Sequence, residues 1–67
     1  MLKLKTVCKL IVGTPVNVFA QGVHDYLAWS CSPEVVAEQL GDCTVVEMYT
    51  VIPERRGDSP SITIVVA

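Results

Sequence analysis

Beta-branched residues make up nearly a third of this chain, with twelve Val, four Ile and five Thr among 67 residues. Such side chains lose rotamer freedom in a helix and fit the pleated, half-buried surface of a sheet. The apolar fraction is 51% and the charged fraction only 18%, against about 25% charged residues in an ordinary soluble domain. These proportions exclude an intrinsically disordered chain. They predict a fold dominated by a sheet with an aliphatic core.

The length of the chain limits the chemistry that it can support. We expect a single domain over residues 1–67, and a domain of this size has little room for an enclosed pocket. His24-Asp25 is the one pair of a histidine next to a carboxylate. On a strand, neighbouring side chains point to opposite faces, so this pair would not form a relay. The sequence therefore predicts a protein that is not an enzyme, with no catalytic residue and no cofactor.

Residues 2–12 show the period-two alternation of a strand. One face carries apolar or small side chains, and the opposite face carries Lys3, Lys5 and Lys9. Lysines on an edge strand are a common block to aggregation. Gly13-Thr14-Pro15 then interrupts the pattern, so we expect the strand to end at this turn.

Residues 16–30 fit two interpretations. In one, a helix begins at Thr14-Pro15, a favoured pair for the N-cap and the first helical position. In the other, two strands join at a turn around Gly22. Glycine costs a helix interior about 1 kcal/mol, and the β-branched residues before it are poor helix formers. We favour the hairpin, with strands over residues 16–20 and 23–30.

Ser32-Pro33-Glu34 is the clearest helix start in the chain. Serine caps the first N–H groups, proline suits the first helical position, and glutamate in the first turn meets the positive end of the helix dipole. An apolar stripe follows at Val36, Ala37 and Leu40, and Gly41 is expected to end the helix as a C′ glycine. So short a helix is not stable alone, and we expect it to pack on the sheet.

Two further strands are expected over residues 43–52 and 61–67, joined by a polar loop over residues 53–60. Apolar side chains occupy both faces of residues 43–52, which predicts a central strand or one covered on both sides. The whole pattern predicts a small α+β domain. In it, an antiparallel sheet of three or four strands carries one short helix on one face, in the order ββαββ or βαββ.

The charge distribution and the cysteines bear on partners and compartment. The net charge is −2, and only five residues are basic. Nucleic-acid binding needs many Lys and Arg contacts to phosphates, so no such partner is expected, and no apolar run reaches the length of a membrane span. The cysteines lack metal-site spacing: they are Cys8, Cys31 and Cys43. We therefore expect reduced thiols, no metal site and a cytoplasmic protein.

Arg56-Gly57-Asp58-Ser59-Pro60 lies within the expected polar loop. This five-residue segment resembles the integrin-recognition loop of extracellular matrix proteins, in which a guanidinium and a carboxylate face a receptor from a hairpin tip. The resemblance implies an extracellular adhesion ligand. The same residue types are also those that an ordinary turn requires. We keep adhesion through Arg56-Gly57-Asp58 as the alternative function.

The apolar excess, together with the lack of a catalytic constellation, predicts a non-enzymatic interaction protein. We expect it to bind a larger protein, or itself as a homo-oligomer, through an apolar face or edge of its sheet. The short sheet-plus-helix pattern resembles the small inhibitors that phages and mobile elements encode, including some anti-CRISPR proteins. The candidate contact residues are Tyr26, Trp29, Tyr49, Arg55, Arg56 and Asp58.

Overall fold

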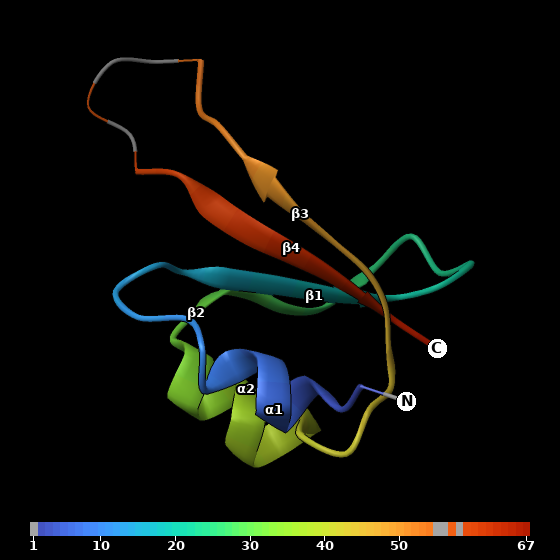
Figure 1. Ribbon diagram of the computed structural model, residues 1–67. Helices are drawn as coiled ribbons and strands as arrows, with labels where there is room; N and C mark the ends of the chain where they lie inside the picture. Colours follow the sequence, from blue (N-terminus) through green and yellow to red (C-terminus); the bar gives the residue numbers. More distant parts are fainter. Residues whose placement is uncertain (1, 55–56, 58) are drawn as a thin grey trace.

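A computed structural model describes residues 2–54, 57 and 59–67. These residues form, in chain order, α1 (Leu4–Cys8), β1 (Val16–Ala20), β2 (Tyr26–Cys31), α2 (Pro33–Leu40), β3 (Val45–Val51) and β4 (Ser61–Val66). The described strands make one sheet in the order β2-β1-β4-β3, and α1 and α2 lie against the same face of it (Figure 1). The expected α+β class is confirmed.

The sheet is mixed, because one of its pairings is parallel. β1 pairs antiparallel with β2 and parallel with β4, and β3 pairs antiparallel with β4. The hairpin expected over residues 16–30 is therefore confirmed, and the helix alternative is wrong. The parallel pairing arises because α2 carries the chain from the edge strand β2 to the opposite edge, where β3 begins (Figure 1). The turn back from β3 then lays β4 alongside β1 in the same direction.

The strand expected over residues 2–12 is wrong, because its central part is the helix α1. The buried side chains of this segment are Leu4, Val7, Cys8 and Ile11. Their spacing of i, i+3, i+4 and i+7 is the apolar stripe of a helix. The same segment also alternates with period two, so both periods fit the sequence, and packing against α2 and the sheet selects the helix.

The helix α1 is anchored by the connection between α2 and β3. Five residues do not form a stable helix alone. The backbone N–H groups of Leu4 and Lys5 donate to the carbonyl oxygens of Cys43 and Gly41, at 2.9 and 3.0 Å. These bonds satisfy donors that the start of a helix leaves without intrahelical partners.

The helix α2 begins after Ser32 and ends before Gly41, as expected. The Ser32 hydroxyl accepts a hydrogen bond from the Val35 N–H at 3.4 Å, with proline following at the first helical position. The last helical residue is Leu40, but Gly41 is the C-cap and not the expected C′ residue, and its φ of −58° is right-handed. A Cβ at Gly41 would collide with the carbonyl oxygen of Ala37 and lie 3.0 Å from the Cβ of Lys5. Glycine is needed here for space, where α1 approaches the end of α2.

The core lies between the helices and the two central strands, β1 and β4. Its largest fully buried side chains are Leu4, Val16, Val18, Val36, Ile64 and Val66. β3, in contrast, is an edge strand, and only Val45 among its residues is even half-buried. The expectation that residues 43–52 form a central or doubly covered strand is therefore wrong. β3 is therefore an edge strand that carries exposed apolar side chains on both faces.

Candidate functional site

The candidate site is the sheet face opposite the helices, which we call the open face. Because side chains alternate along a strand, Val16 and Val18 of β1 point into the core, and Asn17 and Phe19 point to the open face. The cross-strand register extends this face over all the described strands. Its other main residues are Tyr26, Glu47, Tyr49, Val51, Ser61, Thr63 and Val65.

An aromatic cluster occupies the β1–β2 side of the open face. Phe19 and Tyr26 are paired across the two strands, with ring centroids 5.5 Å apart and planes at 80°. Tyr26 also meets Trp29 edge-to-face, at 4.5 Å and 72°. Edge-to-face pairs of this kind are favourable because the positive ring edge meets the negative ring face. Even so, the side chains of Trp29 and Tyr26 remain 61% and 48% exposed.

The strand β2 is irregular on both sides of Trp29. The register between β1 and β2 shifts twice. The first shift lies between the pairs Val16↔Cys31 and Val18↔Ala28, and the second lies between Val18↔Ala28 and Phe19↔Tyr26. Ser30 has a φ of 51°, a left-handed conformation that non-glycine residues rarely adopt. Bulges of this type redirect side chains and break the regular edge of a strand. Here Trp29 is directed over the open face, where it lines a hollow together with Asn17 and Val51.

Asn17 holds this irregular backbone in place from the centre of the open face. Its side-chain oxygen accepts a hydrogen bond from the Ser30 N–H at 2.8 Å. Its amide nitrogen donates to the hydroxyls of Ser61 at 3.2 Å and Thr63 at 3.5 Å. Asn17 and Thr63 are both buried, and a buried amide must be hydrogen-bonded to be tolerated. Asn17 therefore links β1, β2 and β4 and positions the segment that carries Trp29.

Tyr49 lies on the opposite side of the open face. It is paired with Thr63 across β3 and β4 and is 45% exposed. Three strand spacings separate β2 from β3, which places Tyr49 about 14 Å from the line of β2. An open hollow of about 530 Å³ lies on the open face between β2 and β3, at the end where Val51 and Ser61 are paired. Its described lining is Pro15, Asn17, Trp29, Ser30, Val51, Pro53, Ser59 and Ser61.

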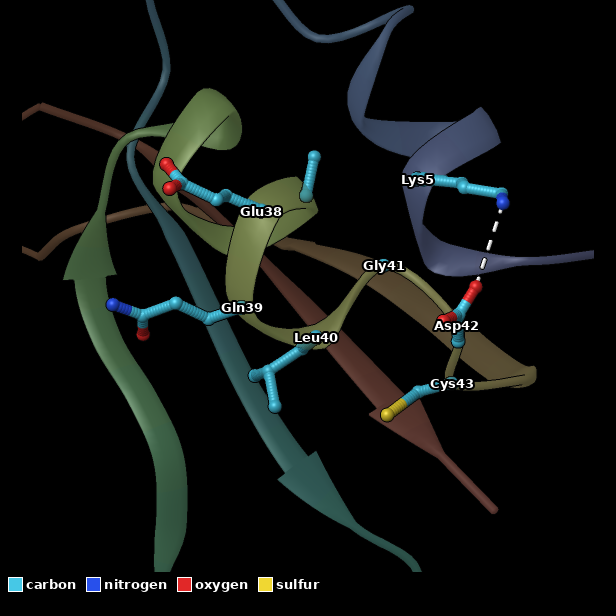
Figure 2. Close-up of a pocket in the computed structure, with 8 residues that line it drawn as sticks. Lys5, Glu38, Gln39, Leu40, Gly41, Asp42 and Cys43 are labelled. Carbon is cyan, nitrogen blue, oxygen red and sulfur yellow. Dashed lines mark hydrogen bonds and ion pairs between the residues drawn. The ribbon is translucent and has the colours of Figure 1, made fainter.

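A second hollow, of about 490 Å³, lies where the end of α2 meets α1 (Figure 2). The Lys5 ammonium lies 3.4 Å from a carboxylate oxygen of Asp42, and both side chains are largely exposed. An exposed pair of this kind contributes little to stability. Figure 2 shows that the Glu38 carboxylate points away from this pair, so the charged groups do not converge on a common point. The arrangement does not resemble an acid–base site.

The other chemically active side chains are dispersed. His24 and Asp25 lie in the exposed connection between β1 and β2, and not on a strand. Among the residues that the structure describes, no three His, Cys, Asp or Glu side chains are grouped as metal ligands. Burial, and secondarily the charge of Glu34, raises the pKa of the Cys8 thiol above its ordinary value. A thiol of this kind is a poor nucleophile at neutral pH.

The sequence identified part of this site. Tyr26 and Trp29 are in contact, and Tyr49 shares their face but lies across the sheet. Arg55, Arg56 and Asp58 lie outside the described residues, so the adhesion-loop hypothesis stays a prediction.

Sequence reasoning missed the other residues of the open face, and the two most important of these are Phe19 and Asn17. The available signal for Asn17 was a single polar residue within the apolar run Val16–Ala20. Such a residue is expected to be hydrogen-bonded when the strand is buried.

Comparison with protein-family models, curated proteins and solved structures gives no match for this chain. Within the described part of the chain, neither helix is long and apolar enough to cross a membrane.

Proposed function

We propose that this chain is a small non-enzymatic binding protein that docks its open face on a larger protein. One observation carries the proposal: the chain has four aromatic residues, and all of them lie on the face that α1 and α2 do not cover. Exposed Trp and Tyr side chains are the residues that most often dominate the energy of protein interfaces. A core-directed role would instead have placed the rings among the buried side chains.

The charges favour a protein over a nucleic acid as the partner. Glu47 is the one charged side chain among the open-face residues that the structure describes. Lys3 and Lys5 both bind Asp42 on the helix side, and Lys9 follows α1. Aromatic side chains can stack on bases, but such binding also needs a basic groove along the backbone. The described open face lacks one.

The proposed setting is the cytoplasm, and the proposed action is that of an inhibitor-like binder. Cys8, Cys31 and Cys43 are free thiols in the structure, as is usual in a reducing compartment. The hollow on this aromatic face is open and not enclosed, so the face suits occupation of a partner's surface and not the enclosure of a small molecule.

Affinity capture with matched variants tests the proposal. The wild-type chain, Trp29→Ala and Leu10→Ala are each immobilised and exposed to lysate of the source cell. Leu10 is the control because it is an exposed apolar side chain that follows α1. We expect a protein retained by wild type and Leu10→Ala and bound about 10- to 100-fold more weakly by Trp29→Ala, as for a central interface aromatic. Equal retention by all three chains would contradict the proposal.

A further inference from the structure

The outer edge of β3 is open along most of its length. The N-terminal segment covers only its beginning: Lys3 bridges to Thr44, and the Val45 N–H donates to the Leu2 carbonyl oxygen at 2.9 Å. From Val46 onward, no described residue pairs with the side of β3 that faces away from β4. In an antiparallel pair, alternate residues direct their N–H and C=O groups outward. The edge therefore presents a row of backbone groups ready for another strand.

The sequence of this edge carries little that would prevent pairing. Natural edge strands are usually blocked by lysine, proline or bulges. Residues 46–51 contain neither lysine nor proline, and their pairing with β4 is regular from Glu47 to Val51. Glu47 is the one charge in this segment.

The side chains of β3 also fit a strand with neighbours on both sides. Met48 is paired with the core residue Ile64, yet it is 51% exposed because the described helices do not extend over β3. Figure 1 shows the far end of β3 projecting beyond both helices. Val46 is similarly exposed. Apolar side chains on both faces are typical of a central strand, yet β3 lies at an edge of the sheet. A further strand paired alongside β3 would give it a central position.

We propose that two copies of this chain pair β3 with β3 in antiparallel fashion, about a two-fold axis that passes through Met48. The two sheets then form one continuous sheet, with the open faces of both copies on the same side. The pairing is isologous, so it closes as a dimer and does not propagate. It uses the β3 edge and not the aromatic cluster, and so it goes beyond the proposed binding of a larger protein.

The charge of Glu47 selects this register. A two-fold axis perpendicular to the sheet can be centred on Glu47, Met48 or Tyr49, near the middle of the strand. Centring on Glu47 sets two carboxylates opposite each other, which is destabilising. Centring on Tyr49 sets each carboxylate against an apolar Val51. Centring on Met48 sets Glu47 opposite the second copy's Tyr49, whose hydroxyl can donate to the carboxylate, and brings the two flexible methionines together.

Sedimentation over a range of protein concentrations tests the dimer. We expect wild type to dimerise as concentration rises and Met48→Lys, which sets two ammonium groups opposite each other, to raise the dimer Kd at least about tenfold. Leu10→Lys is the matched control, since Leu10 is exposed and lies away from β3, and it should dimerise as wild type does. A wild type that stays monomeric, or a dimer that Met48→Lys leaves intact, overturns the proposal. So does a dimer that Trp29→Ala abolishes, because that contact would involve the open face.

Cysteine cross-linking tests the register and does not depend on how Met48→Lys folds. After mild oxidation, Met48→Cys should give a covalent dimer through its new thiol, whereas wild type and Thr50→Cys, which keeps Glu47 and lies opposite Val46 in this register, should not. A covalent dimer from Thr50→Cys but not from Met48→Cys overturns the register. Failure of these tests leaves partner binding through Trp29 untouched, because that is measured with the captured protein.

Discussion

The two edges of the sheet are built in opposite ways. β2 is irregular, with two register shifts, a left-handed Ser30 and a backbone N–H held by Asn17. β3 is regular from Glu47 to Val51 and has no comparable irregularity in that span. Both edges carry exposed apolar side chains, so composition does not separate them. We infer that the irregular backbone of β2, and not its composition, hinders pairing with another strand. β3 is then the edge that is available for pairing.

The largest expected effect comes from removing the amide that fixes the closed edge. Asn17→Ala leaves the Ser30 N–H without its acceptor and the Ser61 and Thr63 hydroxyls without their donor. We expect a loss of about 2–3 kcal/mol in unfolding free energy, the cost of leaving buried polar groups unsatisfied. Chemical denaturation measures it. Thr63→Val, which removes only one weak partner of Asn17, should cost less than about 1 kcal/mol, and an equal loss in both variants would contradict the role given to Asn17.

The next effect compares an aromatic residue on each edge. Tyr26 contacts both Phe19 and Trp29, whereas Tyr49 has no aromatic neighbour among the described residues. Aromatic pairs contribute about 0.5–1.5 kcal/mol each beyond their buried area. Tyr26→Ala should therefore destabilise the protein by about 2 kcal/mol, and clearly more than Tyr49→Ala, by thermal or chemical unfolding. The reverse order would show that β3 is the better-packed edge.

A smaller effect is expected from the strained residue of β2. Ser30→Val places a β-branched side chain at a φ of 51° and should cost about 1–2 kcal/mol. Ser30→Gly relieves the same conformation and should be neutral or stabilising by up to about 1 kcal/mol. Unfolding midpoints of the two variants measure the difference. Similar midpoints would argue against a left-handed Ser30 in solution.

The smallest effect concerns Cys8, in the core between the helices and the central strands. Burial raises the pKa of the Cys8 thiol above its ordinary value of 9.0, so the native state retains this proton longer than the unfolded state. Stability from this source is complete below pH 9.0 and is lost as pH rises through the folded-state pKa. Wild type should therefore lose more stability above pH 9.0 than Cys8→Ala does. Parallel pH profiles for the two chains would contradict this.

Much of the fold follows from local signals in the sequence. The start of α2 was predictable because Ser32-Pro33-Glu34 matches the chemistry of a helix N-terminus, and the strands were predictable from their β-branched runs. The segment of α1 was not, because residues 2–12 fit both periods. Leu4, Val7 and Cys8 have helical spacing, whereas Leu4, Cys8 and Leu10 fall on one face of a strand. The edge position of β3 was also hidden. Apolar residues on both faces of a strand are typical of burial, and only the path of α2 shows that the helices stop short of it.

The site was predictable only in part, for a related reason. Tyr26, Trp29 and Tyr49 stand out by residue type, but the contacts among them depend on cross-strand register. The two shifts in β2 set that register, and the first of them includes a hydrogen bond from Ser30 to Asn17, which are 13 residues apart. A period-two pattern does not reveal such shifts. Phe19 and Asn17 became visible as site residues only once β1 and β2 were paired.

Backbone hydrogen exchange, recorded at low and high protein concentration, tests the contrast between the edges most directly. We predict that amides of residues 46–50 that are not bonded to β4 become protected as concentration rises, because a second β3 pairs with them. The amides of β2 should exchange at the same rate at both concentrations. Exchange of the β3 amides that is independent of concentration, or new protection confined to β2, would contradict the account.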